Sequence, residues 1–275
     1  MGAMKIAAIQ MTSEPDVGAN LAQARPLLED AAEEGAAVAV LPENFAFMGL
    51  ADADKRRIAE PDGSGPIQDF LAGTAQRLRL WIVGGTMPLQ PGPDGRAAAA
   101  CLVYDADGKR VARYDKIHLF DVDIPERGER YRESAHVAPG SVPVVVDSPV
   151  GRIGLSVCYD VRFPELFRRL SAQGAELLTV PAAFTAPTGR AHWETLLCAR
   201  AIENLCYVVA PAQSGFHANG RETYGDSMIV DFWGRVAQRL PRGRGCVVAE
   251  VDRERQAQAR ASFPALQHRA ACLGP

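Results

Sequence analysis

Residues 151–166 read GRIGLSVCYDVRFPEL and place a cysteine between a strand pattern and a helix pattern. Apolar side chains such as Ile153 and Leu155 alternate with small residues, which predicts a strand that leads to Cys158. The face with the small residues leaves room for a substrate. Pro164 is typical of a first helical turn, so the thiol is predicted at the carboxyl end of a strand, where α/β proteins bind ligands. A buried structural cysteine is the alternative for this segment alone.

Strand and helix patterns alternate on both sides of this segment. Strands are predicted at 4–11, 36–43, 81–86, 98–105, 109–120, 176–184, 205–212, 226–232 and 246–252, and helices at 17–34, 67–80, 164–173, 191–204 and 253–260. The alternation favours an α/β fold with mixed sheets and helices on the outer faces. Periodicity alone leaves open whether the strands form one sheet or two.

The chain is predicted to form a single domain over residues 1–275, because no long linker, low-complexity tract or repeat interrupts it. Residues 4–255 are expected to be its core, and residues 256–275 a tail in dimer or surface contacts. Residues 1–3 are set aside as an expression remnant before Met4.

Composition excludes several classes of protein. A net charge of −3 and a pI near 6.0 argue against a nucleic-acid or acidic-membrane binder. No apolar run reaches the roughly 18 residues that span a bilayer, and no signal peptide is evident, so the expected location is the cytoplasm. The six cysteines form no C-x-x-C pair and the five histidines lie at no metal-ligand spacing. Reduced thiols, no metal and no cofactor are therefore expected.

Three reactive residues each follow a predicted strand: Glu43, Lys116 and Cys158. Strand ends converge in α/β folds, so these side chains are expected to meet. Lys116 is one of only four lysines in a chain with 26 arginines, which suggests that a compact ammonium is required there. Taken singly, Glu43 could be a helix cap or surface charge, and Lys116 an edge-strand charge.

Thiol chemistry connects the three residues. A cysteine of ordinary pKa is only about 3% thiolate at neutral pH, so it needs a base or a nearby cation. Glu43 could take the proton. Lys116 could lower the thiol pKa, or donate to an oxyanion beside the backbone N–H of Tyr159. Glu133 could hold Lys116 by charge and hydrogen bonding, its alternative being an exposed loop carboxylate.

At these residues the chain resembles the nitrilase superfamily of carbon–nitrogen hydrolases. The likeness rests on LPENF around Glu43, YDKIHLFD around Lys116 and GLSVCYDVRFPEL around Cys158, in that order. HLFDVDIP, RESAHVAPG and FPALQHR further resemble the branch that contains deaminated-glutathione amidases and ω-amidases.

The resemblance implies a four-layer α-β-β-α sandwich, a homodimer whose sheets stack across the interface, and no cofactor. It implies Glu43 as general base and acid, Lys116 as oxyanion stabiliser, Cys158 as nucleophile and Glu133 as a carboxylate that supports the lysine and orients substrate. The implied reaction is hydrolysis of a small amide through a thioester, with release of a carboxylate and ammonia.

Substrate contacts are predicted at three further residues. Arg162 could bind a substrate carboxylate, as an arginine at this place does in related carbamoyl-amino-acid hydrolases, or could pair with Asp160 or Glu165. Phe184 and Thr188 follow a strand and are expected to form a second pocket wall. The charged loop at 121–132 is expected to be a mobile flap.

Rival functions remain open. Nitrilases and N-carbamoyl amino acid hydrolases would share the same three residues. A Cys–His protease would use His118, which is predicted on the same strand face as Lys116, but it leaves Glu43 and Lys116 unexplained. A non-catalytic scaffold would have no need of all three.

Overall fold

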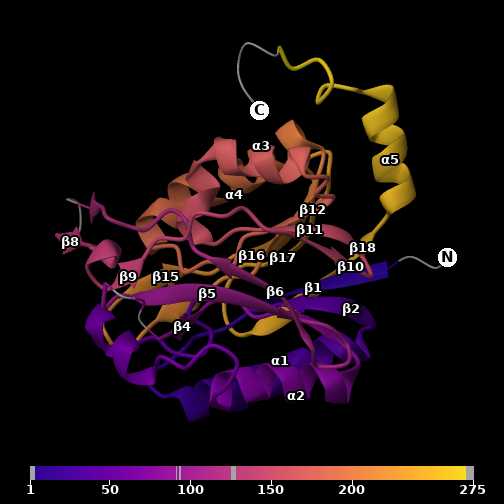
Figure 1. Cartoon of the computed structure of the whole chain (residues 1–275). Coiled ribbons are helices and arrows are strands. Elements are labelled where there is room, and N and C mark those ends of the chain that lie inside the picture. Colours follow the sequence, from indigo (N-terminus) through magenta and orange to yellow (C-terminus); the bar gives the residue numbers. More distant parts are fainter. Residues whose placement is uncertain (1–3, 91, 93, 125–127, 271–275) are drawn as a thin grey trace.

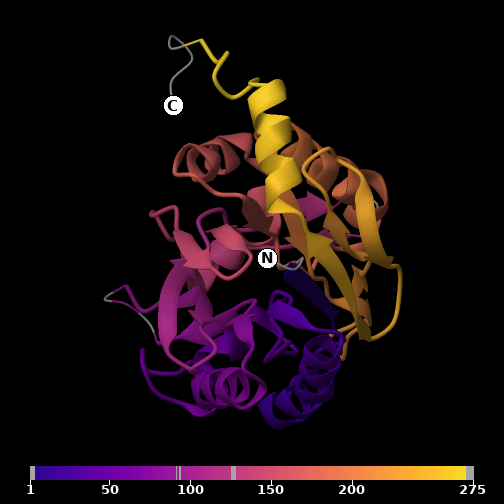
Figure 2. The ribbon, with the colours of Figure 1, turned by 90° about the vertical axis from the view of Figure 1, so that its right-hand side faces the viewer.

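The computed structural model describes residues 4–90, 92, 94–124 and 128–270. The remnant predicted at residues 1–3 lies outside this range. Two sheets stack face to face, with α1 and α2 on one outer side and α3 and α4 on the other (Figure 1). Figure 2 shows the same layers from another side, with α5 standing outside them. The predicted four-layer architecture is confirmed.

The strands divide into two mixed sheets and two small ribbons. In order, the first sheet holds β18 (Gly245–Val251), β1 (Met4–Gln10), β2 (Ala36–Val40), β3 (Trp81–Val83), β5 (Ala97–Tyr104) and β4 (Met87–Leu89), with β6 (Arg110–Asp115) and β9 (Val137–Ala138) also pairing with β5. The second sheet holds β10 (Val145–Ser148), β11 (Gly151–Leu155), β12 (Leu177–Thr179), β13 (Tyr207–Ala210), β16 (Ser227–Val230) and β17 (Val236–Leu240). The ribbons pair β7 (Asp123–Ile124) with β8 (Glu129–Arg130), and β14 (Ser214–Phe216) with β15 (Glu222–Tyr224).

The helices are α1 (Val17–Glu33), α2 (Pro66–Leu78), α3 (Pro164–Ala172), α4 (Ala186–Asn204) and α5 (Arg253–Ser262). Short 3₁₀ turns are η1 (Asp52–Ile58), η3 (Glu133–Ala135) and η4 (Cys158–Arg162). None of the helices within the described ranges is long and apolar enough to cross a bilayer.

Strand β1 shows why the sequence stacks two sheets. Ile6 and Ala8 join the core shared with the second sheet, whereas Ala7 and Ile9 join the core under α1 and α2. Because successive side chains of a strand point to opposite faces, a strand that is apolar at every position must be covered on both sides. The helices cover one face and the second sheet covers the other.

Strand directions bring the predicted reactive residues to one edge. β1, β2 and β3 are mutually parallel, and β6 runs the same way because two antiparallel pairings, through β5, separate it from β3. Glu43 follows β2 and Lys116 follows β6, so both leave the same end of the first sheet. In the second sheet Cys158 follows β11, which is parallel to β12 and β13.

Two local predictions about the second sheet and its helices were wrong. A Cβ added at Gly154 would lie 3.0 Å from the Cβ of Leu170, so the space beside the small residues of β11 is occupied by α3 and not by a substrate. Helix α4 begins at Ala186, five residues before its predicted start, with Pro187 in its first turn. Proline fits there because the first turn has no use for its missing N–H.

Candidate active site

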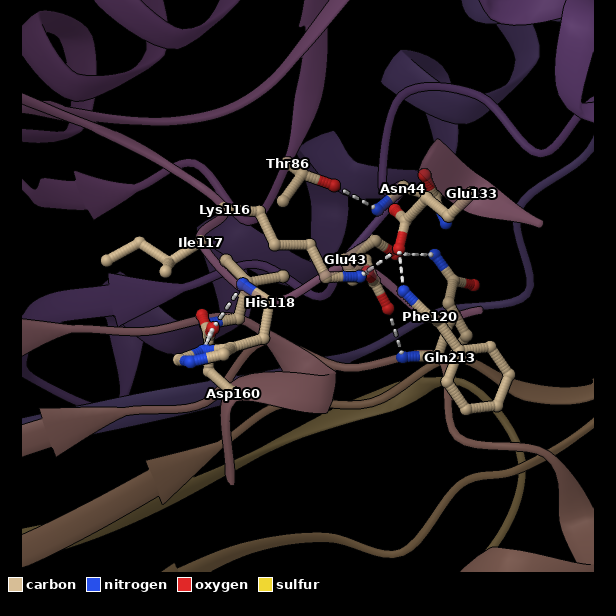
Figure 3. A network of polar contacts seen from close by, with 12 residues as sticks. Glu43, Asn44, Thr86, Lys116, Ile117, His118, Phe120, Glu133, Asp160 and Gln213 are labelled. Atoms are coloured by element: carbon tan, nitrogen blue, oxygen red, sulfur yellow. Dashed lines mark hydrogen bonds and ion pairs between the residues drawn. The ribbon is translucent and has the colours of Figure 1, made fainter. Parts of the chain in front are cut away.

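A buried lysine lies between two carboxylates at the centre of the site (Figure 3). Lys116 Nζ donates to Glu43 Oε1 at 2.8 Å and to Glu133 Oε2 at 2.8 Å. The Lys116 side chain is 2% exposed, and those of Glu43 and Glu133 are 7% and 12% exposed. These residues are therefore neither surface charges nor caps, and the predicted convergence of Glu43 with Lys116 is confirmed.

The turn after β2 fixes Glu43. Asn44 has a φ of 57°, and its N–H donates to Thr86 Oγ1 at 2.8 Å. The Glu43 carbonyl accepts from Gln213 Nε2 at 3.0 Å (Figure 3). A Cβ on Gly85 would lie 2.0 Å from the carbonyl oxygen of Pro42, so only glycine lets the neighbouring loop pass behind this turn. The backbone thus aims the carboxylate, and its Oε2 accepts from the N–H of Ala183 at 2.9 Å.

Cys158 begins the 3₁₀ turn η4 with a φ of 49°, a left-handed conformation that is strained for a residue with a Cβ. Its N–H donates to the Pro181 carbonyl at 2.9 Å, which ties the strained residue to the end of β12. The residue is 6% exposed and lines the central pocket. Backbone strain held in place by neighbouring strands is typical of a functional residue.

Electrostatics define the resting protonation of the site. Burial, followed by the charge of Glu43 and a hydrogen bond to it, raises the pKa of the Cys158 thiol well above its ordinary value, although Lys116 opposes the shift. Burial lowers the pKa of Lys116, but Glu133 and Glu43 outweigh it and hold that pKa well above its usual range. Burial raises the pKa of Glu133, but the charge of Lys116 and its hydrogen bond outweigh burial, so that pKa is lowered. Lys116 therefore stays charged, while the thiol stays protonated at rest.

Asp160 joins the segment of Lys116 to that of Cys158. Its fully buried carboxylate accepts from Tyr114 Oη at 2.7 Å, from the N–H of Val157 at 2.8 Å and from the N–H of His118 at 3.0 Å. His118 Nδ1 is 2.7 Å from the same carboxylate, and its ring stacks on Phe163. Strand β6 ends at Asp115, so His118 does not share a strand face with Lys116. The histidine of the protease alternative is thus engaged by Asp160.

A pocket opens over the central residues. Its lining includes Arg162, Phe184, Thr188 and Tyr159, as predicted for the first three, together with Asn44, Lys55, Phe120, Ala183, Thr185 and Arg221. The Arg162 guanidinium lies 5.3 Å from the Phe184 ring centroid and 5.8 Å from that of Tyr159. Its Nη1 is 3.3 Å from His192 Nδ1, and among the described contacts it pairs with neither Asp160 nor Glu165.

Two of the pocket residues that sequence reasoning missed, Lys55 and Arg221, come from segments without a chemical motif. Lys55 belongs to η1 and Arg221 follows the turn His217–Gly220, whose patterns indicate only polar surface. The predicted flap at 121–132 contains residues 125–127, outside the described ranges. Its described part forms the β7–β8 ribbon, closed by an ion pair between Arg132 and Asp123 at 2.9 Å.

The sequence matches the carbon–nitrogen hydrolase family over residues 5–261. The chain belongs to this family. The predicted resemblance to the nitrilase superfamily is confirmed, and the protein is a hydrolase of carbon–nitrogen bonds.

The chain is similar to known proteins over nearly all of its length. The chain is 46% identical to the deaminated glutathione amidase of a Synechocystis strain, over 96% of this chain and 97% of that protein. The crystal structure of the Caenorhabditis elegans NitFhit protein is 39% identical, with a TM-score of 0.92 over 100% of this chain and 67% of that chain. A glutamate-to-glutamine mutant of the amidase from Nesterenkonia sp. AN1 is 28% identical, with a TM-score of 0.82 over 98% of this chain and 95% of that chain. That mutant carries the acetamide moiety of fluoroacetamide covalently on its active-site cysteine.

Proposed function

We propose that this carbon–nitrogen hydrolase cleaves deaminated glutathione, with Cys158 as nucleophile, Glu43 as base and acid, and Lys116 as oxyanion stabiliser. The observation that carries the mechanism is the position of the Glu43 carboxylate, 2.8 Å from Lys116 and in the same pocket as Cys158. The covalent adduct on the cysteine of the Nesterenkonia amidase supports the nucleophile. The identity to the Synechocystis amidase supports the substrate.

The proposed reaction begins when Glu43 takes the Cys158 proton and Sγ attacks the amide carbonyl carbon. The carbonyl oxygen gains negative charge, which the Lys116 ammonium and the N–H of Tyr159 stabilise. The C–N bond then breaks and Glu43 gives its proton to the departing nitrogen. In the second half Glu43 deprotonates a water that attacks the thioester, the C–S bond breaks, and the proton returns to sulfur.

The leaving group follows from the chemistry of the substrate. Glutathione is γ-glutamyl-cysteinyl-glycine, so both amides of its deaminated form are secondary. Hydrolysis at the γ-carbonyl therefore releases a dipeptide amine and not the ammonia expected from the sequence. Arg162 is proposed to bind the carboxylate of the keto-acid half, since its planar fork matches a carboxylate. Phe184 and Thr188 would form the wall beside it.

The test is hydrolysis by purified protein, with Cys158→Ser as its control. The panel contains deaminated glutathione, α-ketoglutaramate, aliphatic amides, N-carbamoyl amino acids and nitriles, and both amine and ammonia release are followed. We expect the highest kcat/KM on deaminated glutathione, lost in the variant. Preference for α-ketoglutaramate would make the protein an ω-amidase, and preference for a carbamoyl compound or nitrile would indicate the corresponding activity. Turnover that survives in the variant would refute the role of Cys158.

We also propose that the chain is one catalytic unit that forms a homodimer, with residues 256–275 in dimer or surface contacts. In the described part of this tail, Gln256 Nε2 donates to the carbonyls of Glu176 and Leu205, both at 2.8 Å. These bonds attach α5 to the segments beside β12 and α4. They support the proposal that α5 belongs to the same catalytic unit as the two sheets. Light scattering of the purified protein measures the mass, and a monomer would contradict the dimer.

A further inference from the structure

A second, wider cavity adjoins the catalytic pocket. Both cavities are lined by Asn44, Lys55 and Arg221, so these three residues lie at the boundary between them. Only the inner pocket contains Cys158 and Arg162. The outer cavity adds Tyr131, Arg130 and Asn219, among other residues. A substrate much longer than the reacting amide therefore has a place to lie.

Arg221, at the junction of the two cavities, has unused hydrogen-bonding capacity. Among the described residues, only the carbonyl of Ala183 accepts from its guanidinium, through Nη2. Its Nε is buried and has no hydrogen-bond partner in that set. Two other partly buried arginines are paired with carboxylates, Arg113 with Asp115 at 2.9 Å and Arg239 with Asp226 at 2.6 Å. A buried donor left unpaired is destabilising, so an acceptor from a ligand is the expected partner.

The surroundings of Arg221 hold it in position. Its N–H donates to Asn219 Oδ1 at 3.0 Å, and its carbonyl accepts from the N–H of His217 at 2.9 Å. The guanidinium lies 5.0 Å from the ring centroid of Tyr131, a cation–π contact. The contact with Ala183 places it next to the catalytic group, because the N–H of Ala183 donates to Glu43. A fixed, partly desolvated guanidinium is suited to bind a carboxylate through two parallel hydrogen bonds.

The order of product release indicates which end of the substrate reaches Arg221. The acyl half stays on Cys158 as a thioester, whereas the amine half must leave before water attacks. The amine half therefore belongs in the wider outer cavity, and the acyl half in the inner pocket with Arg162. This assignment rests on the proposed function.

We propose that Arg221 binds the terminal carboxylate of the peptide leaving group, and so selects peptide-like amides over short primary amides. The site is a subsite for a carboxylate several bonds beyond the scissile nitrogen.

The test compares two substrates that differ only in this carboxylate. One is deaminated glutathione, and the other is its analogue that ends in an N-methylamide in place of glycine. Their kcat/KM ratio is measured for wild type, Arg221→Met and Arg221→Lys. The control is Arg190→Met, since Arg190 is an exposed arginine in a separate cavity that shares no lining residue with these two.

Loss of a bidentate charged contact is worth about 10- to 100-fold, so the wild type should prefer deaminated glutathione by that factor. The ratio should fall to within about 3-fold in Arg221→Met, lie between in Arg221→Lys, and keep its wild-type value in Arg190→Met. A wild-type ratio near one overturns the proposal even if the variants fail to fold. So does an Arg221→Met variant that retains the wild-type ratio, or that loses both substrates equally. Wild-type protein that hydrolyses neither compound refutes the proposed function itself, and the subsite with it.

Discussion

Replacing Lys116 by methionine should destabilise the fold, because it leaves two buried carboxylates without their shared cation. The bound oxygens of Glu43 and Glu133 each lie 2.8 Å from Nζ, so they are no more than twice that distance apart. Two like charges at that separation repel by about 3 kcal/mol at an effective dielectric constant of about 20. Removing one partner of a buried pair typically costs about 3–5 kcal/mol. We expect the free energy of unfolding at pH 8 to fall by that amount.

The loss should shrink in acid. In the wild type, burial raises the pKa of Glu133, but Lys116 outweighs burial and lowers that pKa. The lowered pKa stabilises the fold above the ordinary carboxyl pKa, and this stabilisation is lost as pH falls. In the variant, burial and repulsion raise the carboxyl pKa, so the fold takes up a proton that relieves the repulsion as pH falls. Both effects bring the two proteins closer at pH 5 than at pH 8.

Urea unfolding at the two pH values, followed by the fluorescence of the three tryptophans, measures this difference. Lys109→Met is the matched control, because Lys109 is exposed in the β5–β6 turn, and it should change stability little. Adding Glu133→Gln to Lys116→Met should restore much of the loss, since it removes one of the two charges. A Lys116→Met protein as stable as wild type at pH 8, with the same pH dependence, would refute this electrostatic account.

Three further substitutions test other parts of the site. Lys116→Arg keeps the charge but not the compact ammonium, so turnover should fall at least about 100-fold; near-normal turnover would contradict the oxyanion role. Asp160→Asn puts an amide where Tyr114 and backbone N–H groups donate, and should lower the free energy of unfolding by about 1–3 kcal/mol. Thermal unfolding measures this loss, and an unchanged melting temperature would show that these hydrogen bonds do not stabilise the fold. Burial lowers the pKa of His217, so the unfolded chain binds a proton at this histidine first as pH falls. Wild-type stability should therefore fall as pH drops below about 6.5. His217→Gln should lack this pH dependence of stability, and an equal dependence would assign it to other groups.

Local pattern was enough to predict the elements around the reacting residues. The alternation at Ile153 and Leu155 defines β11, and the continuous apolar run of β2 marks a strand buried on both faces. The convergence of Glu43 with Lys116 was predictable because strand direction, not side-chain detail, brings their strand ends together. Whether one sheet or two would form required the family resemblance, since periodicity does not say what covers each face.

Features that depend on contacts between distant segments could not be predicted. Gly154 has the small size that a substrate pocket would favour, yet its free space is filled by Leu170 of α3. Arg221 belongs to a polar turn, and its value as a ligand contact arises only from Ala183 and Tyr131, far away in sequence. Such a residue looks like ordinary surface until the fold brings its neighbours together.

The protonation of the site favours Glu43 as the base of the proposed mechanism. Lys116 has a pKa raised well above its usual range by two carboxylates and cannot accept a proton, and the Cys158 thiol keeps its own until it is taken. Glu133 Oε2 already accepts from Lys116 and from the N–H of Phe120 at 2.8 Å. Glu43 pairs with the lysine and lines the same pocket as Cys158, so it is the carboxylate of this cluster that is placed to pass a proton between sulfur and substrate. The same pairing keeps Lys116 charged, so its ammonium can stabilise the oxyanion that forms after Glu43 has taken the thiol proton.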